Sequence, residues 1–160
     1  FSTKRNIKDF YKTILPVQIH AFSSSSSSAT LPLTIECAEK GLNISNETAS
    51  FVLPIGATVN MDGTSCYQSI AAVFLAQVIG IDLTLTQMLT IILTSTLSSI
   101  GTPGIPGGSI VMVMIVLSSI GIPIESLALI IGIDRPLDML RTVTNVTGDT
   151  TVACIVDETI

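Results

Sequence analysis

The chain has 160 residues, of which 48% are hydrophobic and only 12% are charged, and its mean hydropathy is +0.70. This number of charged side chains is too small to cover the surface of a soluble domain of this length. The composition therefore excludes an ordinary water-soluble protein and indicates a membrane protein. The formal net charge of −5 says little about partners, and we expect no nucleic acid among them.

The chain begins at Phe1, with neither a methionine nor a signal peptide. We therefore expect an internal or C-terminal piece of a longer protein, with N-terminal helices absent. Cys37, Cys66 and Cys154 have no paired or metal-ligand spacing, and we interpret them as buried or inert thiols. The same interpretation applies to His20.

Residues 10–40 consist of two short apolar arms around six consecutive serines at 23–28. Each arm is shorter than the roughly 20 residues that cross a bilayer, so the segment predicts a re-entrant hairpin with the serines at its tip. A flexible polyserine linker is the alternative. The basic residues Lys4, Arg5, Lys8 and Lys12 place the start of this segment on the cytoplasmic side of the membrane.

Residues 48–82 are long enough to span a membrane but are interrupted by GATVNMDGT at 56–64. A helix broken at membrane depth leaves backbone carbonyls free to bind a small cation beside Asp62. A glycine-rich kink between packed helices is the alternative. Residues 86–122 form a second pair of short arms around the tip IGTPGIPGGS, where glycine and proline preclude continuous helix and expose backbone groups.

The last predicted helix, residues 126–157, carries a polar stripe. At roughly 100° per residue, its polar side chains fall within an arc of about 80°, with Leu137, Leu140, Val143 and Val146 on the opposite face. The stripe consists of Asp134, Asp138, Arg141, Asn145 and Asp149. On a soluble helix such a stripe would face water, but in a membrane these groups are costly and usually mark a substrate or ion pathway.

The predicted fold class is therefore an all-α membrane protein with two re-entrant helical hairpins, a broken transmembrane helix and a polar-striped transmembrane helix. The order hairpin, helix, hairpin, helix is an inverted pseudo-repeat, the arrangement in which secondary transporters place a binding site at the bilayer midplane.

Four motifs at these positions resemble one family, the dicarboxylate/amino acid:cation symporters, which include archaeal aspartate transporters and excitatory amino acid transporters. The motifs are SSSATLP, NMDGT, SIGTPGIPGG and DMLRTVTNVTGD, and the resemblance to the C-terminal transport domain extends from about residue 10 to residue 158. It implies sodium-coupled symport of L-aspartate or L-glutamate by an elevator-type movement, in a multi-pass protein of the plasma (inner) membrane, in contact with lipid and trimeric at full length. A proton-coupled C4-dicarboxylate symporter is the alternative.

The resemblance also implies roles for individual residues. Arg141 matches the arginine that binds the side-chain carboxylate of the substrate, and Asp138 matches the residue that accepts its ammonium group. Thr142 and Asn145 match further polar contacts. The remaining wall positions are Ser26, Ser27, Ser28, Thr64, Ile105 and Gly108. A mutually satisfied ion pair between Asp138 and Arg141 is the structural alternative.

For sodium ions, the resemblance implies three sites. The first combines Asp149 with carbonyl groups of Gly56, Asn60 and Asn145. The second combines Thr58 with carbonyl groups of Ser99, Ile100 and Thr102. The third uses Asp62 together with a helix that this chain lacks.

The sequence departs from the family at three positions. Ser25 and Met139 stand where archaeal and eukaryotic members, respectively, have an arginine, and Arg135 is the candidate for the replacement charge. Gln68 stands where eukaryotic glutamate carriers have a glutamate linked to proton movement, which favours a sodium-driven cycle.

Two other classes of protein fit the sequence less well. A channel would need a continuous polar lumen, whereas the charged groups here converge on one site. A hydrolase with a nucleophilic serine would have His20 as its only histidine base, and no triad can be proposed, so we expect no enzyme activity.

Overall fold

The computed structural model describes residues 5–160, and Phe1 and Lys4 lie outside the described residues. Within residues 5–160 the secondary structure is helical and contains no strand, which confirms the expected all-α class. The elements are α1 (Ile7–Ser24), α2 (Ser27–Leu42), α3 (Asn46–Val59), α4 (Asp62–Val78), α5 (Leu85–Ile100), α6 (Gly108–Ser119), the 3-10 helix η1 (Ile124–Leu127) and α7 (Ala128–Asp157).

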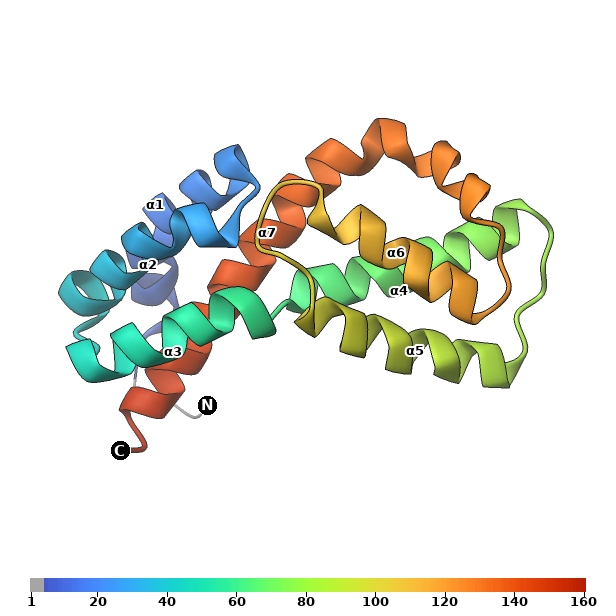
Figure 1. Cartoon of the computed structure of the whole chain (residues 1–160). Coiled ribbons are helices and arrows are strands. Elements are labelled where there is room, and N and C mark those ends of the chain that lie inside the picture. Colours follow the sequence, from blue (N-terminus) through green and yellow to red (C-terminus); the bar gives the residue numbers. More distant parts are fainter. Residues whose placement is uncertain (1–4) are drawn as a thin grey trace.

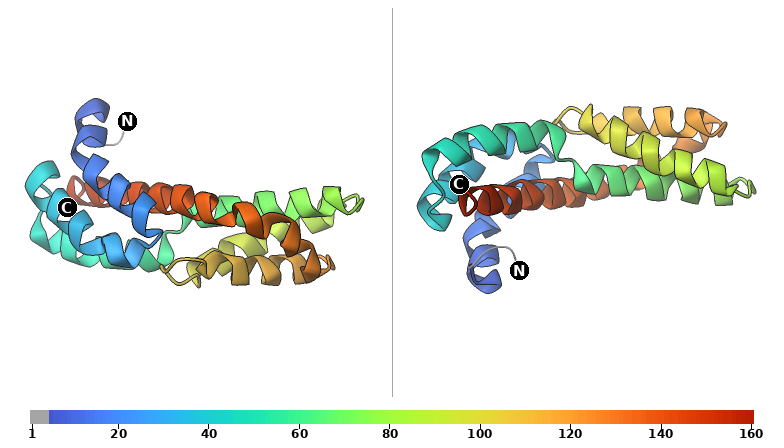
Figure 2. Two further views of the ribbon diagram at one scale, coloured as in Figure 1. Left: turned by 90° about the horizontal axis from the view of Figure 1, so that it is seen from above. Right: turned by 90° about the horizontal axis from the view of Figure 1, so that it is seen from below.

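The helices form an elongated body, and α7 extends through most of the length of that body (Figure 2). The pair α1 and α2 approaches from one end, and the pair α5 and α6 approaches from the other. Their connecting segments, which we call tip 1 (25–26) and tip 2 (101–107), meet near the middle of α7 (Figure 1).

Local capping explains where the first helices end. Ser25 ends α1 in the left-handed conformation, with φ of 52°, and the Ser26 side chain caps α2 by accepting a hydrogen bond from the Ala29 backbone N–H at 3.1 Å. The other four serines of the run belong to the two helices. The serine run is therefore a tight turn between helices, which argues against a flexible linker.

The interruption between α3 and α4 is shorter than the sequence suggested. Only Asn60 and Met61 leave the helical conformation, whereas we expected unwinding over 56–64. The Gly56 carbonyl still accepts a hydrogen bond from the Asn60 N–H at 2.9 Å. Hydrogen bonding thus continues to the end of α3, so the free backbone groups are concentrated at one two-residue joint.

Two hydrophobic clusters lie on either side of this joint. One joins α4, α5 and α6 to the start of α7 and includes Leu75 and Leu117. The other joins α1, α2 and α3 to the end of α7 and includes Ile14 and Leu53. The two tips and the helix joint therefore lie between two packed halves.

Many large apolar side chains are exposed on the outside of these halves. Examples from five elements are Phe51, Ile70, Leu85, Val111 and Leu129. Among residues 5–160, no helix combines the length and the apolar character needed to cross a membrane.

Glycine permits the close approach of α3 to α7. A Cβ atom at Gly56 would lie 2.6 Å from Asp149 Oδ1, closer than such atoms pack, whereas a Cβ at Gly132 on α7 would have no atom within 4 Å. Any side chain at position 56 would therefore push the two helices apart at the Asp149 carboxylate.

We expect Gly56→Ala to destabilise the protein by about 1 to 3 kcal/mol, because the added methyl group overpacks this contact. Gly132→Ala is the matched control and should be neutral or stabilising by up to about 1 kcal/mol, because alanine favours helix. Thermal unfolding of the purified complete protein in detergent measures both changes. Equal unfolding midpoints for the two variants would contradict the predicted contact.

Candidate functional site

The polar stripe of α7 faces the interior of the protein. Its members are Asp134, Asp138, Arg141, Asn145 and Asp149, and each is at most 6% exposed. On the other side of the same helix, Ile133 and Leu140 are each 55% exposed. Charged groups are thus inside and apolar groups outside, the reverse of a helix on a soluble protein.

Arg141 lies at the centre of a buried ion cluster. Its guanidinium group lies 3.0 Å from Asp134 Oδ1 and 3.0 Å from Asp138 Oδ1. Its Cζ atom is 4.2 Å from the centre of the Tyr67 ring, and the Tyr67 hydroxyl donates to Asp134 Oδ1 at 2.8 Å. The ion pair between Asp138 and Arg141, which was the alternative to a substrate-binding role, is therefore present. Arg141 also contacts a second carboxylate and an aromatic ring.

Tip 1 and tip 2 are hydrogen-bonded to each other. The Ser26 hydroxyl donates to the Gly104 carbonyl at 2.6 Å, and the Ser28 N–H donates to the same oxygen at 3.3 Å. The Gly107 N–H donates to Asp138 Oδ2 at 2.9 Å. Asp138 therefore joins tip 2 to α7 with one oxygen and binds Arg141 with the other.

A small cavity of ≈ 20 Å³ lies where the tips meet α7. Its lining comes from tip 1, tip 2, the start of α4 and the stripe of α7, and consists of Ser25, Ser27, Met61, Thr64, Thr102, Pro103, Gly104, Ile105, Ser109, Asp138, Thr142 and Asn145. A space of this size holds about one water-sized group, so an amino acid requires the tips to separate.

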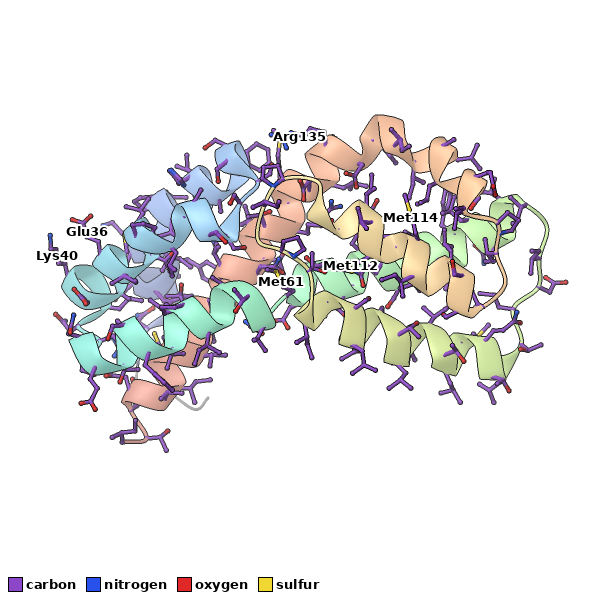
Figure 3. All side chains as sticks on the ribbon, viewed as in Figure 1. Glu36, Lys40, Met61, Met112, Met114 and Arg135 are labelled. Atoms are coloured by element: carbon purple, nitrogen blue, oxygen red, sulfur yellow. The ribbon has the colours of Figure 1, made fainter. Side chains whose placement is uncertain are left out.

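Asn145 attaches the start of α4 to α7. Its Oδ1 accepts from the Gly63 N–H at 2.8 Å, and its Nδ2 donates to Thr64 Oγ1 at 3.1 Å. Thr142, one turn earlier, uses its hydroxyl on the Asp138 carbonyl of its own helix at 2.8 Å. The helix joint, labelled by Met61 in Figure 3, is thus fixed against the middle of α7.

Asp149 and Asn60 form a second polar centre one turn further along α7. The Asn60 Nδ2 donates to Asp149 Oδ1 at 3.0 Å. A Cβ at Gly148 would lie 2.8 Å from Asp62 Oδ2, so the Asp62 carboxylate also reaches α7. Gly56, Asn60, Asp62 and Asp149 therefore lie together, as a cation site would need.

Several expected site residues lie at the surface. Ser28, Thr58 and Ile100 are exposed, and the Thr58 hydroxyl donates to the Ile55 carbonyl of its own helix at 3.0 Å. Ile105 lines the cavity but is also largely exposed. The Ser99 hydroxyl of α5 and the Thr102 hydroxyl of tip 2 are buried, but each bonds to a carbonyl three or four residues earlier. Gly108, the first residue of α6, is half-buried. Among the described residues, no cluster of three or more His, Cys, Asp or Glu could hold a metal ion.

The departures from the family pattern occupy defined positions. The Arg135 Nη1 atom lies 3.8 Å from Asp138 Oδ2 and its side chain is exposed, at the upper edge of the region of the tips in Figure 3. Met139 is half-buried. Gln68 is fully buried, and its Oε1 accepts from the Ser98 hydroxyl at 2.7 Å, which links α4 to α5.

Sequence reasoning missed three contributors to the site. Tyr67 was not singled out, although an aromatic residue with a hydroxyl in a chain with only 4% aromatic residues was a usable signal. Ser25 was noted only as a departure, and Ser109 was not considered. Nothing in the spacing of either serine indicates that its hydroxyl lines the cavity.

Comparisons with known proteins identify the family of the chain. Residues 1–159 match the model of the sodium:dicarboxylate symporter family. The chain is 49% identical over 155 residues to excitatory amino acid transporter 4 of Rattus norvegicus, 48% identical to excitatory amino acid transporter 1 of Ambystoma tigrinum and 43% identical to an excitatory amino acid transporter of Caenorhabditis elegans.

Each of these alignments covers 97% of this chain but only 28%, 28% and 31% of the respective relative, so the chain spans less than a third of these transporters. Both the match of the family model and the identities extend across nearly all of the chain. The chain belongs to the sodium:dicarboxylate symporter family, whose members are transporters and not enzymes.

Proposed function

We propose that this chain is the C-terminal transport domain of a sodium-coupled symporter for acidic amino acids, L-aspartate or L-glutamate. The observation that carries the proposal is the meeting of both tips with the charged stripe of α7 at one small cavity. Its support from relatives is that proteins 43% to 49% identical to this chain carry the name excitatory amino acid transporter.

Substrate recognition follows from the buried charges. Arg141 can bind a carboxylate with two parallel hydrogen bonds, but in this structure its guanidinium already binds Asp134 and Asp138. A substrate that carries both a carboxylate and an ammonium group satisfies Arg141 and Asp138 separately. The zwitterionic acid thus replaces the internal pair between them without leaving either charge unpartnered.

The Asp138 carboxylate also favours an amino acid over a plain C4-dicarboxylate. It lines the cavity, where a second carboxylate of a dicarboxylate would meet it with like charge. Thr142, Asn145, Thr64 and the serines of tip 1 supply the neutral polar wall. An ammonium group on the substrate is attracted to the Asp138 carboxylate, whereas a second carboxylate group is repelled by it.

Sodium ions are the proposed co-transported cargo. Asp149 supplies a buried carboxylate, which accepts a hydrogen bond from the Asn60 Nδ2 atom in this structure. The carbonyl groups of Gly56, Asn60 and Asn145 are the further proposed ligands. Asp62, exposed on this chain, is the proposed ligand of a further site completed by another helix. The site of Thr58, Ser99, Ile100 and Thr102 requires Thr58 to turn inward from its present contact with Ile55.

The transport cycle proposed here combines these parts. Sodium orders the joint of α3 and α4, the amino acid enters between the tips, and tip 2 closes over it. The domain then moves across the membrane against a scaffold, in an elevator-type motion. Coupling requires that closure depend on both ligands, because closure over either ligand alone would let that ligand leak.

Membrane placement is part of the same proposal. The hairpin pairs α1–α2 and α5–α6 are re-entrant, α3–α4 is the broken helix, and the complete protein is a multi-pass homotrimer in the plasma (inner) membrane. The exposed apolar side chains of α3, α4, α5 and α7 are the surfaces that lipid and scaffold helices would cover.

The first test removes the guanidinium group. In the complete transporter, Arg141→Cys should lower kcat/KM for L-aspartate uptake roughly 100-fold or more. The reason is that the substrate carboxylate loses its buried partner of opposite charge, which costs several kcal/mol. Uptake into proteoliposomes measures the change, with Lys12→Cys, an exposed cation on α1, as the control.

Loss of Arg141 leaves two buried carboxylates near each other, so the protein must also be shown to fold. The double variant Arg141→Cys with Asp134→Asn removes one of these charges and should be monodisperse in detergent, yet still fail to transport. Undiminished uptake of acidic amino acids by Arg141→Cys would contradict the assignment of Arg141 to the substrate site.

The second test concerns sodium. Asp149→Asn keeps the size of the side chain but removes its charge, so the sodium concentration that half-saturates L-aspartate binding should rise roughly 10-fold or more. Isothermal titration of L-aspartate at a series of sodium concentrations measures this value. Glu47→Gln, an exposed carboxylate on α3, is the control, and an unchanged sodium requirement in Asp149→Asn would remove Asp149 from the proposed site.

A further inference from the structure

The first turns of α1 extend away from the rest of the molecule (Figure 2). Every residue from 6 to 12 is exposed except Phe10, which is half-buried against the apolar cluster of α1, α2 and α3. Further along the helix, Ile14, Val17 and Ala21 are buried and hold α1 against its neighbours. The side chains at the start of α1 are therefore available to a partner outside this domain.

An apolar stripe follows the exposed face of α1. Its members are Ile7, Tyr11, Leu15, Ile19 and Phe22, and their exposed fractions range from 44% to 71%. At roughly 100° per residue, these five side chains fall within an arc of about 120°. A continuous apolar surface of this kind indicates contact with a protein or with a membrane.

Two lysines lie along one edge of the stripe, near its N-terminal end. Lys8 and Lys12 are four residues apart and exposed, so they share one side of the helix. Among residues 5–160, neither lysine has an ion-pair partner, whereas Arg5 already pairs with Asp157 at 3.7 Å. Asp9 projects about 100° away from Lys8 around the helix. The net charge of the chain is −5, so this free positive charge is a local feature.

The length of α1 places these lysines at the height of lipid headgroups, given the proposed membrane placement with tip 1 near the bilayer midplane. At about 1.5 Å per residue, Lys12 and Lys8 lie about 18 Å and 24 Å from Ser24 along the helix axis. The hydrocarbon core ends about 15 Å from the midplane, and the headgroups end at about 20 to 22 Å. Any tilt of the helix lowers both heights, so the two ammonium groups reach the headgroup layer.

The chemistry of this surface fits a lipid better than a protein. A protein partner would need a carboxylate opposite each lysine, whereas beside lipid the lysine stems can cover the apolar stripe while the ammonium groups stay among phosphates and water. Tyrosine is enriched at the same depth of membrane proteins, where Tyr11 is placed. The basic start of the chain indicates the cytoplasmic side, and the cytoplasmic leaflet is the one that carries anionic lipids.

We propose that the start of α1 is a docking surface for anionic phospholipid. Lys8 and Lys12 bind the phosphate groups, and Tyr11 and Leu15 contact the upper part of the acyl chains. This inference rests on the membrane placement given under the proposed function, and it adds an interaction surface outside the transport site. No residue of this surface lines the cavity between the tips.

The test identifies what touches Tyr11 in the complete transporter. The photoreactive residue p-benzoylphenylalanine replaces Tyr11, and the protein is reconstituted in phosphatidylcholine vesicles that contain about one fifth phosphatidylserine. Irradiation links this residue to its neighbour, and mass spectrometry identifies the product. We expect lipid products in which phosphatidylserine exceeds its share of the vesicle lipid roughly 10-fold, because two lysines near the surface attract it.

Variants at the lysines separate charge from other effects. Lys8→Gln with Lys12→Gln should return phosphatidylserine to its share of the vesicle lipid, and Lys8→Arg with Lys12→Arg should keep the enrichment. Lys40→Gln is the matched control, because Lys40 is exposed on α2 but pairs with Glu36 at 2.9 Å. Salt at about 1 M should act like the glutamine variant, since it screens charges beyond about 3 Å.

The fold of the glutamine variant is checked separately. Both lysines are exposed, and glutamine is as good a helix former as lysine, so the unfolding midpoint should equal that of the parent. Sodium-dependent uptake of L-aspartate in vesicles of pure phosphatidylcholine should also equal the parent value, because neither lysine belongs to the proposed transport site.

Three results would overturn the lipid surface. They are a product that links position 11 to another segment of the transporter, phosphatidylserine at its vesicle share in the parent, and equal enrichment in the glutamine variant. Each can occur in a transporter with normal uptake, and the proposed function then stands. Enriched phosphatidylserine in a parent without uptake of acidic amino acids would instead support this surface and contradict the proposed substrate.

Discussion

The burial of Arg141 between two carboxylates is the constraint on which the rest of the structure depends. Charges held at 4% to 6% exposure are stable only when each has a close partner of opposite sign. Asp134 and Asp138 supply negative charge, and Arg141, with Arg135 at 3.8 Å from Asp138, supplies positive charge. Because this cluster belongs to α7, it fixes which face of that helix points inward.

The orientation of α7 then determines how the neighbouring helices pack. Polar contacts from α4 and from tip 2 end on the inward face, through Tyr67, Asn145 and the Gly107 N–H. Tip 1 is attached to tip 2 through the Ser26 hydroxyl and the Gly104 carbonyl. The apolar residues of α7 and the outer helices remain exposed, as on a membrane protein. Small residues permit the close contacts, since a Cβ at Gly63 would lie 2.6 Å from the Arg141 carbonyl.

The sequence predicted the parts of this arrangement that depend on local periodicity. The spacing of Asp134, Asp138, Arg141, Asn145 and Asp149 alone placed them on one helix face, and their scarcity in an apolar chain indicated burial. The sequence could not predict that Arg141 and Tyr67 would both bind the Asp134 carboxylate, because the contact of Tyr67 depends on how α4 packs against α7. The helix joint was predicted too wide, since glycine weakens a helix without requiring that it unwind at Gly56.

In the proposed transport cycle, Asp138 connects recognition of the substrate to movement of tip 2. One of its oxygens binds Arg141 and the other holds the Gly107 N–H, so an ammonium group that approaches Asp138 competes directly with the tip. A ligand shifts a conformational equilibrium only by its difference in affinity between the two states. In the proposed cycle the tip loses its bond to Asp138 when the ligand arrives, so closure over the ligand must be stabilised by new contacts to the ligand itself. Hydrogen-bond donors on both tips, beside a carboxylate that cannot hold tip and ligand with the same oxygen, provide that difference.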